Sequence, residues 1–316
     1  MRTRRSQSSS DPVSSTPLSG GGHRSVLLHE AIESLTLAQN DIVVDATLGG
    51  GGHAKRIADK LGKNGMLIGF DLDGEAVLRA REALQGVSPR VLLFQKNFRE
   101  LRSALDEAGV PHITKALFDL GWSSYQLDSG RGFSFLKDEP LLMTYATEIT
   151  PRTLTAEKIV NEWEEKNIAD VIWGWGEERY SRRIARAIVE ARARKPIKTS
   201  RELAEIIKSA VPSPYRRGRI HPATRTFQAL RIAVNDELGA LAEGLRGAWG
   251  KLSPGGKLAV ISFHSIEDRI VKQTFAAWEK DGVGLRMTKK PLGPSEEEVR
   301  ENPRSRSAKL RVVEKV

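Results

Sequence analysis

The sequence predicts an α/β protein in which a Rossmann-like sheet is interrupted by an inserted, all-helical segment. Three observations predict this fold. Short apolar runs alternate with helical patterns as far as Asp119, helical patterns alone continue as far as Pro222, and the alternation then resumes. With 316 residues, of which 39% are apolar, the chain is long enough to bury a large core.

The first alternating part starts with an amphipathic helix over residues 26–35. Strands are expected over 42–45, 66–71, 91–95 and 113–119, and helices between them over 53–61, 75–84 and 101–108. Strands separated by helices in this way form a parallel sheet with crossover helices on its faces.

Helical periodicity without strands is found over 156–163, 168–173, 181–193 and 200–210. One long helix over 224–249, a turn over 253–256 and a strand over 257–263 then return the chain to the sheet. We therefore predict a core formed by residues 23–137 and 223–316, and a helical insertion over 138–222 that binds the substrate.

The first 22 residues are rich in Ser, Pro and Gly and have only Val13 and Leu18 as large aliphatic side chains. Such a segment cannot bury enough apolar surface to offset the entropy of ordering, so residues 1–22 are expected to be a disordered tail. Their arginines and serines also suggest an organellar transit peptide, but the amphipathic apolar stripe of such a peptide is missing.

Composition argues against several classes of protein. The chain has no cysteine, which removes disulfides, thiolate metal sites and cysteine nucleophiles together. The six histidines show no metal-ligand spacing, so we expect no metal and no metal-dependent hydrolysis. No run approaches the ~18 apolar residues that a membrane helix needs, so no membrane partner is expected.

The positive charge of the chain is concentrated in one segment. Residues 179–231 hold 15 Lys and Arg against three acidic residues, an excess of +12, whereas the rest of the chain holds 35 basic and 37 acidic residues. Such clustering is typical of a surface that binds a polyanion. It predicts nucleic-acid binding centred on this segment and its loop arginines Arg216, Arg217 and Arg219, with a solvated helical face as the alternative.

A glycine-rich turn, Asp45-Ala-Thr-Leu-Gly-Gly-Gly-Gly-His53, joins the first strand to the next helix. Glycines let the backbone approach a ligand closely, and the helix amides then face that ligand. The turn fits neither the dinucleotide fingerprint G-x-G-x-x-G nor a phosphate loop ending in G-K-[ST]. Here an acid ends the first strand ahead of Gly-x-Gly, and Asp71 ends the second strand, where it can accept both ribose hydroxyls. This is the pattern of S-adenosylmethionine enzymes.

Asp119 ends the fourth strand, within Phe118-Asp-Leu-Gly-Trp-Ser-Ser124. The carboxyl ends of strands line the ligand crevice of an open α/β sheet, so Asp119 is predicted to face the reactive end of the cofactor. A carboxylate there can hold an exocyclic amine of cytosine or adenine in line with the sulfonium methyl, which predicts a catalytic role. A cap on the following turn is the structural alternative.

His264 lies in Ile261-Ser-Phe-His-Ser-Ile-Glu-Asp268, directly after the fifth strand and at the same edge of the sheet. We predict that it is a donor to the substrate or a general base, with a structural histidine as the alternative. Glu267 and Asp268 are expected to stabilise the N-terminus of the following helix.

Further substrate contacts are expected near the two ends of the helical segment. In His221-Pro-Ala-Thr-Arg-Thr-Phe-Gln-Ala-Leu-Arg231, Arg225 and Arg231 flank a helix start and are predicted to position phosphates, with an ordinary capped helix as the alternative. Four aromatic residues come after the fourth strand: Trp122, Tyr125, Phe133 and Phe135. We expect them either to stack on an extruded base or to pack the insertion against the sheet.

Together these stretches resemble the RsmH (MraW) family, which methylates the N4 amine of a cytidine in the decoding centre of small-subunit ribosomal RNA. The resemblance runs from about residue 23 to the C-terminus. The motifs that carry it are His23–Glu30, Gly50–His53, Asp119–Gly121, Ser123–Ser124, Gln126–Asp128, Arg131–Phe135, Gly176–Arg179, Arg182–Ile188, His221–Arg231, Ile261–Ser265 and Asn302–Ser307.

The resemblance implies a Rossmann-like core with a helical insertion and S-adenosylmethionine as the cofactor. It also implies a cytoplasmic enzyme, a homodimer, that acts on small-subunit ribosomal RNA or on the assembled small subunit. The cofactor contacts that it implies are Gly51, Gly52, His53, Asp71, Phe98, Asp119 and Gln126.

The chain departs from the family pattern near the expected substrate pocket. Trp122 and Tyr125 replace a small residue and a proline, and the loop between Asp128 and Arg131 is one residue shorter. The usual Pro-Leu-Asp-Met-Arg-Met-Asp reads Pro140-Leu-Leu-Met-Thr-Tyr-Ala146, without two acids and an arginine. Two other functions therefore stay open: a non-catalytic, RNA-binding assembly factor, and a methyltransferase that acts on DNA or on a protein side chain.

Overall fold

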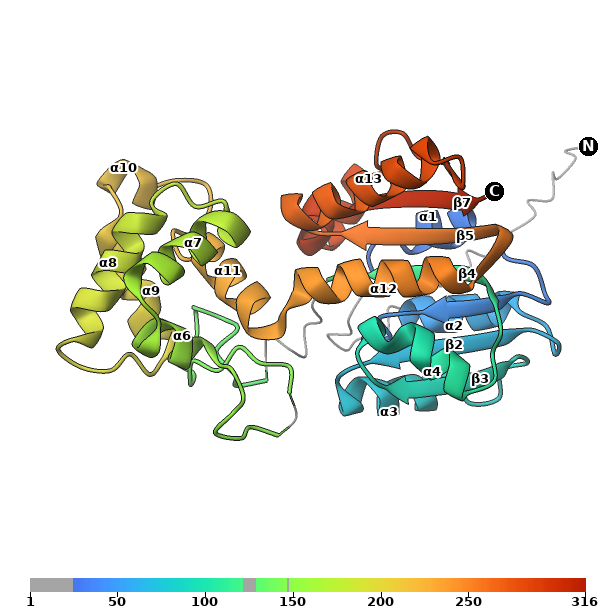
Figure 1. The fold of residues 1–316 in the computed structure, drawn as a ribbon, viewed down its shortest axis with the longest axis horizontal. Coiled ribbons are helices and arrows are strands. Elements are labelled where there is room, and N and C mark those ends of the chain that lie inside the picture. The colour runs from blue at the N-terminus through green and yellow to red at the C-terminus, as the bar shows by residue number, and fades with distance from the viewer. Residues whose placement is uncertain (1–24, 122–128, 147) are drawn as a thin grey trace, which may run out of the picture.

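The computed structural model describes residues 25–121, 129–146 and 148–316. A sheet covered by helices forms the core, and the helical insertion lies beyond one end of the strands (Figure 1). The predicted tail over 1–22 lies outside the described residues, as do Trp122, Tyr125 and Gln126. The predicted fold class, a Rossmann-like sheet with a helical insertion, is confirmed.

The core contains a seven-stranded sheet in the order β3-β2-β1-β4-β5-β7-β6. Its strands are β1 (Ile42–Asp45), β2 (Met66–Asp71), β3 (Arg90–Gln95), β4 (Ile113–Asp119), β5 (Leu252–Ser262), β6 (Gly284–Arg286) and β7 (Lys309–Lys315). Strands β1 to β5 are parallel, and β7 is antiparallel to both of its neighbours. Because β4 pairs with β1 on the side away from β2 and β3, the strand order reverses there, and α/β sheets bind ligands at such a point.

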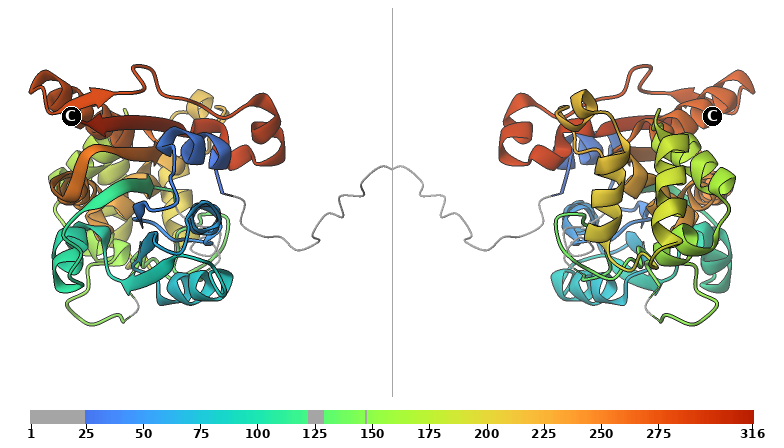
Figure 2. Two further views of the ribbon diagram at one scale, coloured as in Figure 1. Left: turned by 90° about the vertical axis from the view of Figure 1, so that its right-hand side faces the viewer. Right: turned by 90° about the vertical axis from the view of Figure 1, so that its left-hand side faces the viewer.

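Helices cover both faces of the sheet (Figure 2). One face is covered by α1 (Leu28–Leu35), α2 (Gly52–Lys60) and α3 (Gly74–Ala83); the other is covered by α4 (Leu101–Glu107), α12 (Glu237–Lys251) and α13 (Ser265–Lys280). In β1, Val43 and Val44 pack into the two different apolar clusters, because successive side chains of a strand face opposite sides. Burial on both faces explains why the strands read as continuous apolar runs.

The helical insertion has an apolar core of its own. Its helices are α6 (Ala156–Glu162), α7 (Glu165–Gly176), α8 (Ser181–Arg192), α9 (Ser200–Ala210), α10 (Ser213–Arg216) and α11 (Thr224–Asn235). Their shared apolar cluster reaches from Phe133 to Leu230, and so extends beyond both ends of the predicted range 138–222. Among the described residues, no helix is both long enough and apolar enough to cross a membrane.

The prediction of one helix over 224–249 is wrong, because the chain breaks between α11 and α12. Asp236 adopts a left-handed conformation with φ of 48°, which a continuous helix does not allow. The Asn235 side chain donates to the Met143 carbonyl and accepts the N–H of Tyr145, which fixes the end of α11. The break places Glu237 at the first position of α12, beside the sheet edge.

The C-terminal part of the sheet also goes beyond the predicted elements. Strand β5 begins at Leu252 rather than at Lys257, and β6 and β7 were not among the expected strands. Between them lie α14 (Glu296–Glu301) and the 3₁₀ helix η2 (Pro303–Ser307). A further 3₁₀ helix, η1 (Phe98–Glu100), comes after β3.

Candidate active site

The glycine turn after β1 forms one wall of a cavity at the switch point. Gly51 has φ of +78°, a left-handed conformation that strains residues with a Cβ. A Cβ on Gly52 would lie 2.1 Å from Ser25 Oγ, so this glycine lets the chain before α1 pack against the start of α2. The turn glycines that line the cavity are Gly49 and Gly50, whereas Gly51 and Gly52 shape the turn behind them.

Asp71 ends β2 at the cavity wall, and both of its oxygens are held by the backbone. Oδ2 accepts the Gly49 N–H at 2.8 Å, and Oδ1 accepts the Asp73 N–H at 2.9 Å. Burial raises the pKa of Asp71, while these two amides lower it. Each oxygen keeps a further lone pair, so a carboxylate fixed in this way can accept two ribose hydroxyls.

Asp45 and Asp119 end the adjacent strands β1 and β4, and Thr47 joins them. The Thr47 N–H donates to Asp45 Oδ1 at 3.2 Å, and its hydroxyl accepts the Asp119 N–H at 2.7 Å. Among the described residues, Asp45 Oδ2 and Asp119 Oδ1 are buried and accept no hydrogen bond. Asp119 lines the cavity, so its oxygen without a donor is suited to a ligand that carries N–H groups or positive charge, whereas Asp45 is fully buried and is not in the cavity wall.

The environment of these two carboxylates favours their protonated forms. Burial, and then the neighbouring Asp119 and Asp71, raise the pKa of Asp45 to about 8. Burial raises the pKa of Asp119 to about 7, with a contribution from Glu267, although the Gly121 amide opposes it. Asp119 can therefore exchange a proton near neutral pH.

Two further predicted cofactor contacts lie at the same cavity. The buried ring of His53, on α2, has its Nδ1 3.5 Å from Asp119 Oδ2. Phe98, which starts η1, packs edge-on against Phe118 with ring centroids 5.5 Å apart. A Cβ on Gly244 of α12 would lie 2.6 Å from the Phe98 ring, so this glycine makes room for the aromatic wall.

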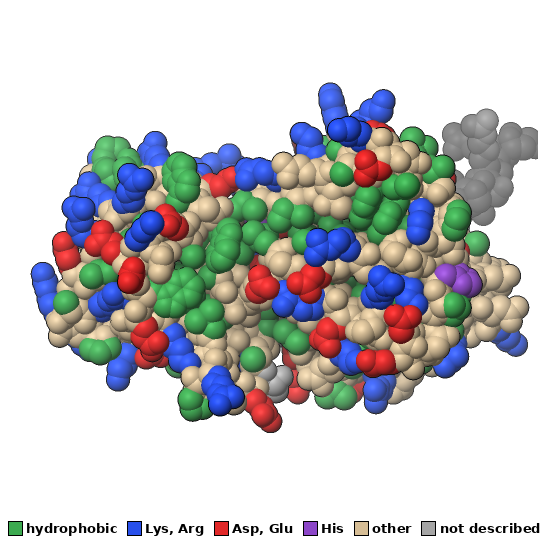
Figure 3. Space-filling model, in the orientation of Figure 1, with side chains coloured by type: hydrophobic (Ala, Val, Ile, Leu, Met, Phe, Trp, Pro, Cys, Tyr) green, Lys and Arg blue, Asp and Glu red, His purple; other side chains and the backbone are tan. Residues whose placement is uncertain are grey.

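The cavity has a volume of about 640 Å³ and runs from the glycine turn to the helical insertion. At the end next to the insertion, the cavity is lined by the aromatic side chains of Phe133, Phe135, Tyr145 and Phe227. Hydrophobic side chains are visible between the insertion and the core in Figure 3. Phe133 and Phe135 also pack in the apolar core of the insertion, so these two rings combine the packing and the cavity-lining roles.

The altered segment 140–146 forms part of this end of the cavity. The Tyr145 ring stacks on Phe133 with centroids 5.3 Å apart, and its hydroxyl donates to Glu237 at 3.1 Å. Arg131 holds the segment by donating to the carbonyls of Thr144 and Ala146. The expectation that this segment lies near a pocket agrees with its position in the cavity wall.

Arg231 lies in the cavity wall and not on the surface. Its side chain is 9% exposed and donates through Nε and Nη2 to the two oxygens of Glu237, each at 2.9 Å. A phosphate could reach these atoms only by displacing Glu237. The geometry therefore opposes the phosphate contact predicted for Arg231 and assigns this arginine to an internal ion pair.

The other predicted arginines are closer to solvent. Arg216, Arg217 and Arg219 are exposed around α10, where Arg216 also donates to the carbonyls of Val211 and Ser209. Arg225 is half-buried at the start of α11 and donates to the Glu177 carbonyl. They are not in the cavity wall, so the structure separates a basic outer surface from the polar interior.

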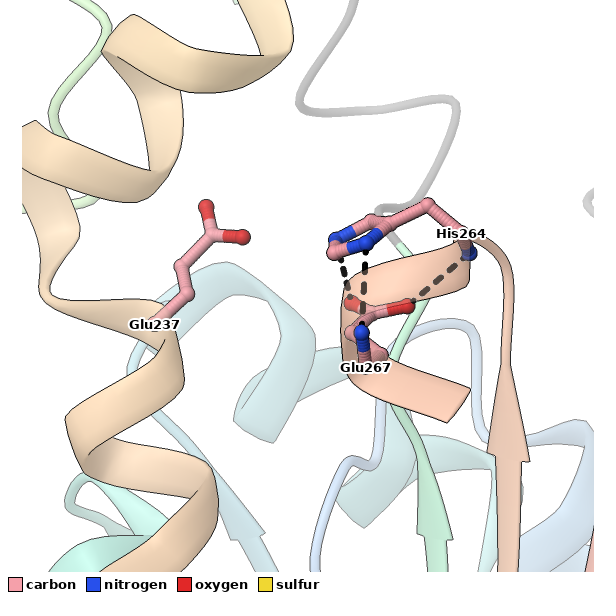
Figure 4. Close-up of side chains that lie close together, drawn as sticks. All are labelled: Glu237, His264 and Glu267. Atoms are coloured by element: carbon pink, nitrogen blue, oxygen red, sulfur yellow. Dashed lines mark hydrogen bonds and ion pairs between the residues drawn. The ribbon is translucent and has the colours of Figure 1, made fainter. Parts of the chain in front are cut away.

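His264 begins α13 and comes close to two glutamates (Figure 4). The atoms of Glu237, His264 and Glu267 that could bind a metal ion lie within 4.8 Å of one another. This grouping could not be found from histidine spacing, because Glu237 comes from the break before α12. Both Glu237 oxygens accept hydrogen bonds from Arg231, so the guanidinium already supplies the positive charge that a metal ion would bring.

The described part of the chain thus brings His53, Asp71, Phe98, Asp119 and His264 to one cavity, as expected for a site on a Rossmann-like sheet. Sequence reasoning missed Tyr145 and Glu237 as members of the site, and it gave Glu267 only a helix-stabilising role. An apolar pattern that continues from α11 into α12 conceals the break that places Glu237 there.

A glycine turn and the strand-end carboxylates of Asp71 and Asp119 at a switch-point cavity define an α/β enzyme of the nucleotide-cofactor type. The profile of the MraW methylase family matches residues 21–316. A ribosomal RNA small subunit methyltransferase H from Symbiobacterium thermophilum is 48% identical, over 93% of this chain and 96% of that protein. The protein of the same name from Brevibacillus brevis is 46% identical, over 93% and 98%.

The chain therefore belongs to the MraW methylase family, and it is an S-adenosylmethionine-dependent methyltransferase. A solved structure of a rRNA methylase from Streptococcus thermophilus has 15% identity and a TM-score of 0.44, covering 92% of this chain and 96% of that one. This likeness is too remote to add to the family assignment. Asp71, and the Asp119 oxygen that accepts no hydrogen bond from the described residues, fit a ligand that offers hydroxyls, an amine and a positive charge.

Proposed function

We propose that this protein methylates the exocyclic N4 amine of a cytidine in the decoding region of small-subunit (16S) ribosomal RNA. The observation that carries the proposal is Asp119, which ends β4 in the cavity wall and has one buried oxygen that accepts no hydrogen bond from the described residues. The names of the relatives supply the class of substrate, and the basic segment 179–231 supplies a surface for RNA.

S-adenosylmethionine supplies a methyl group bound to positively charged sulfur. Asp119 Oδ1 would accept a hydrogen bond from the cytidine N4–H and hold the nitrogen in line for attack. The amine loses one proton when it gains the methyl group, and a carboxyl with a pKa of about 7 can take up that proton near neutral pH. Asp71 would hold the ribose, with His53 and Phe98 around the cofactor, and Gln126 stays a predicted contact.

The proposal places the substrate RNA, free or within the assembled small subunit, against the insertion in the cytoplasm. Arg216, Arg217, Arg219 and Arg225 would contact phosphates, and Trp122 and Tyr125 stay predicted contacts to the base. The homodimer implied by the resemblance also stays a prediction.

Transfer of labelled methyl to small subunits from a strain that lacks its own enzyme tests the proposal. Nucleoside analysis should find the label in N4-methylcytidine. Label in another nucleoside, in DNA or in protein would overturn the assignment of the substrate. Tight binding to subunits with no transfer would instead support a non-catalytic assembly factor.

A further inference from the structure

His264 is held in one orientation by a reciprocal pair of bonds at the start of α13. Its Nδ1 accepts the backbone N–H of Glu267 at 3.3 Å. In return, Glu267 Oε2 accepts the N–H groups of Phe263 and His264 at 2.9 and 3.2 Å. This is a capping box in which a histidine ring replaces the usual Ser or Thr.

The capping bond determines which ring nitrogen carries the proton. A nitrogen that accepts an N–H must present a lone pair, so the neutral His264 ring carries its hydrogen on Nε2. Glu267 Oε1 lies 3.2 Å from Nε2 and favours the hydrogen there electrostatically. Nε2 is buried and makes no hydrogen bond with any described residue. This N–H thus has a close contact with Glu267 Oε1 but no hydrogen bond among the described residues, and His264 lines the cavity near Glu237 (Figure 4).

Glu237 does not satisfy this donor. Its two oxygens receive Arg231 Nε and Nη2, and one of them also receives the Tyr145 hydroxyl. The same three bonds argue against a metal ion between Glu237 and His264, because the ion would lie next to the Arg231 guanidinium. The hydrogen bond that His264 Nε2 lacks among the described residues is left for a ligand to supply.

His264 and Asp119 reach the cavity from neighbouring strands. Asp119 pairs with Ile261, three residues before His264, and parallel strands are about 4.8 Å apart. Both side chains line the same cavity, so it presents an acceptor, Asp119 Oδ1, and a donor, His264 Nε2–H, to one ligand. Cytosine presents the complementary pair, because its N4 amine donates and the adjacent ring N3 accepts. Uracil presents the opposite pair, with a carbonyl at position 4 and a hydrogen on N3.

We propose that His264 is a specificity residue that donates from Nε2 to the ring N3 of the target cytidine, and that Glu267 is the positioning residue that keeps it in this tautomer. The inference rests on the proposed function and deepens it. It explains how the site would select a base in which an exocyclic amine lies next to an accepting ring nitrogen, and reject uridine.

The decisive experiment replaces one atom of the base. Small subunits are reconstituted with 3-deazacytidine at the target, which keeps the amine but has C–H in place of N3. Wild-type kcat/KM should fall about tenfold relative to cytidine, the size expected for one unpaired buried donor. His264→Asn retains an N-cap acceptor for the helix but removes the ring donor. This variant should be slow on both substrates and should not distinguish them.

Comparison across variants cancels the intrinsic difference in reactivity between the two bases. His112→Ala, at an exposed histidine, is the matched control and should discriminate as the wild type does. Equal rates of the wild type on both bases, or full discrimination by His264→Asn, would overturn the inference while methylation of cytidine still upheld the proposed function. A wild-type enzyme that methylates no cytidine would overturn both.

A second measurement examines the tautomer itself and does not depend on turnover. In ¹⁵N-histidine-labelled protein, the His264 ring should show hydrogen on Nε2 and a lone pair on Nδ1. Glu267→Gln keeps an acceptor for Phe263 and removes the charge beside Nε2, so it should weaken the preference and reduce the discrimination about two- to threefold. A wild-type ring with hydrogen on Nδ1 would contradict the proposal.

Discussion

The sheet edge and the helical insertion meet at one cavity but are built in opposite ways. At the sheet edge, three adjacent strands end in Asp45, Asp71 and Asp119. Asp45 is fully buried and the other two are partly buried, and backbone amides hold Asp45 and Asp71. In the insertion, the segment 179–231 holds 15 Lys and Arg against three acidic residues, and its arginines Arg216, Arg217 and Arg219 are exposed. Buried charges respond strongly to small changes in geometry, whereas exposed charges act over longer distances and are screened by salt.

From this difference we expect the two regions to have different roles in the proposed function. Chemistry at an exocyclic amine requires atoms fixed within fractions of an ångström, which strand ends and capping bonds provide. Attraction of a polyanion requires only that many positive charges face it. A substitution at the sheet edge should therefore change methyl transfer or cofactor binding sharply, whereas a substitution on the insertion should change RNA affinity gradually.

The largest effect is expected at Asp119. In Asp119→Ala the fold and RNA affinity should persist, but the rate of methyl transfer should fall about 10²–10³-fold, as for the loss of one preorganised electrostatic group. Asp119→Asn keeps an accepting oxygen without charge, and intermediate activity would indicate acceptor geometry rather than proton removal. Single-turnover rates measure the effect, and cofactor affinity must be checked for both variants. Wild-type turnover in Asp119→Ala would disprove the assignment.

Asp71→Ala should weaken S-adenosylmethionine binding at least about tenfold. The carboxylate is expected to accept two hydrogen bonds from the ribose, each worth roughly 1.5–3 kcal/mol because the acceptor is charged. Titration calorimetry measures the change. Asp59→Ala, at an exposed carboxylate of α2, is the control and should bind as the wild type does. Unchanged affinity in a folded Asp71→Ala protein would show that the ribose is held elsewhere.

On the insertion, replacement of Arg216, Arg217 and Arg219 with Ala should weaken RNA binding about tenfold or less. Each lost phosphate contact should make the slope of log K against log salt shallower by about 0.7 to 0.9. A control variant with Lys60, Lys63 and Arg81 replaced by Ala loses the same charge from exposed positions of the core. If both variants change the slope equally, net charge and not this surface attracts the RNA.

The contrast between the two regions also explains how far sequence reasoning reached. The parallel strands and their strand-end acids could be predicted because a strand buried on both faces reads as a short apolar run, and the residues directly after such strands must lie at one edge. Strand β6 could not be predicted, because Gly284–Arg286 is too short to show an alternation of apolar and polar residues. The capping box between His264 and Glu267 could have been predicted from their three-residue spacing, but histidine is an unusual N-cap residue.

Arg231 shows why the rest of the site could not be predicted. Its sequence context is the basic segment, which suggests a surface. In a continuous helix, residues six positions apart point about 120° away from each other, so Arg231 and Glu237 could not form a pair. Only the left-handed conformation of Asp236 between them makes the pair possible, and the pattern of apolar residues does not predict this conformation.

The smallest expected effect concerns stability at the sheet edge. Asp45 has its pKa raised from 3.8 to about 8 in the folded protein, so between these values the folded state holds a proton that the unfolded state has released. The contribution of Asp45 to the free energy of unfolding therefore falls as pH rises from about 4 to about 8, by at most about 1.4 kcal/mol per pH unit.

Asp45→Asn retains an acceptor for the Thr47 N–H and cannot ionise, so it should lack this part of the pH dependence. Relative to the wild type, the variant should gain at least about 1 kcal/mol of stability between pH 5 and pH 8. Urea unfolding without cofactor at several pH values measures the difference. A difference between variant and wild type that is independent of pH would show that Asp45 is already ionised in the folded protein, and that the sheet edge is less shielded from water than its burial indicates.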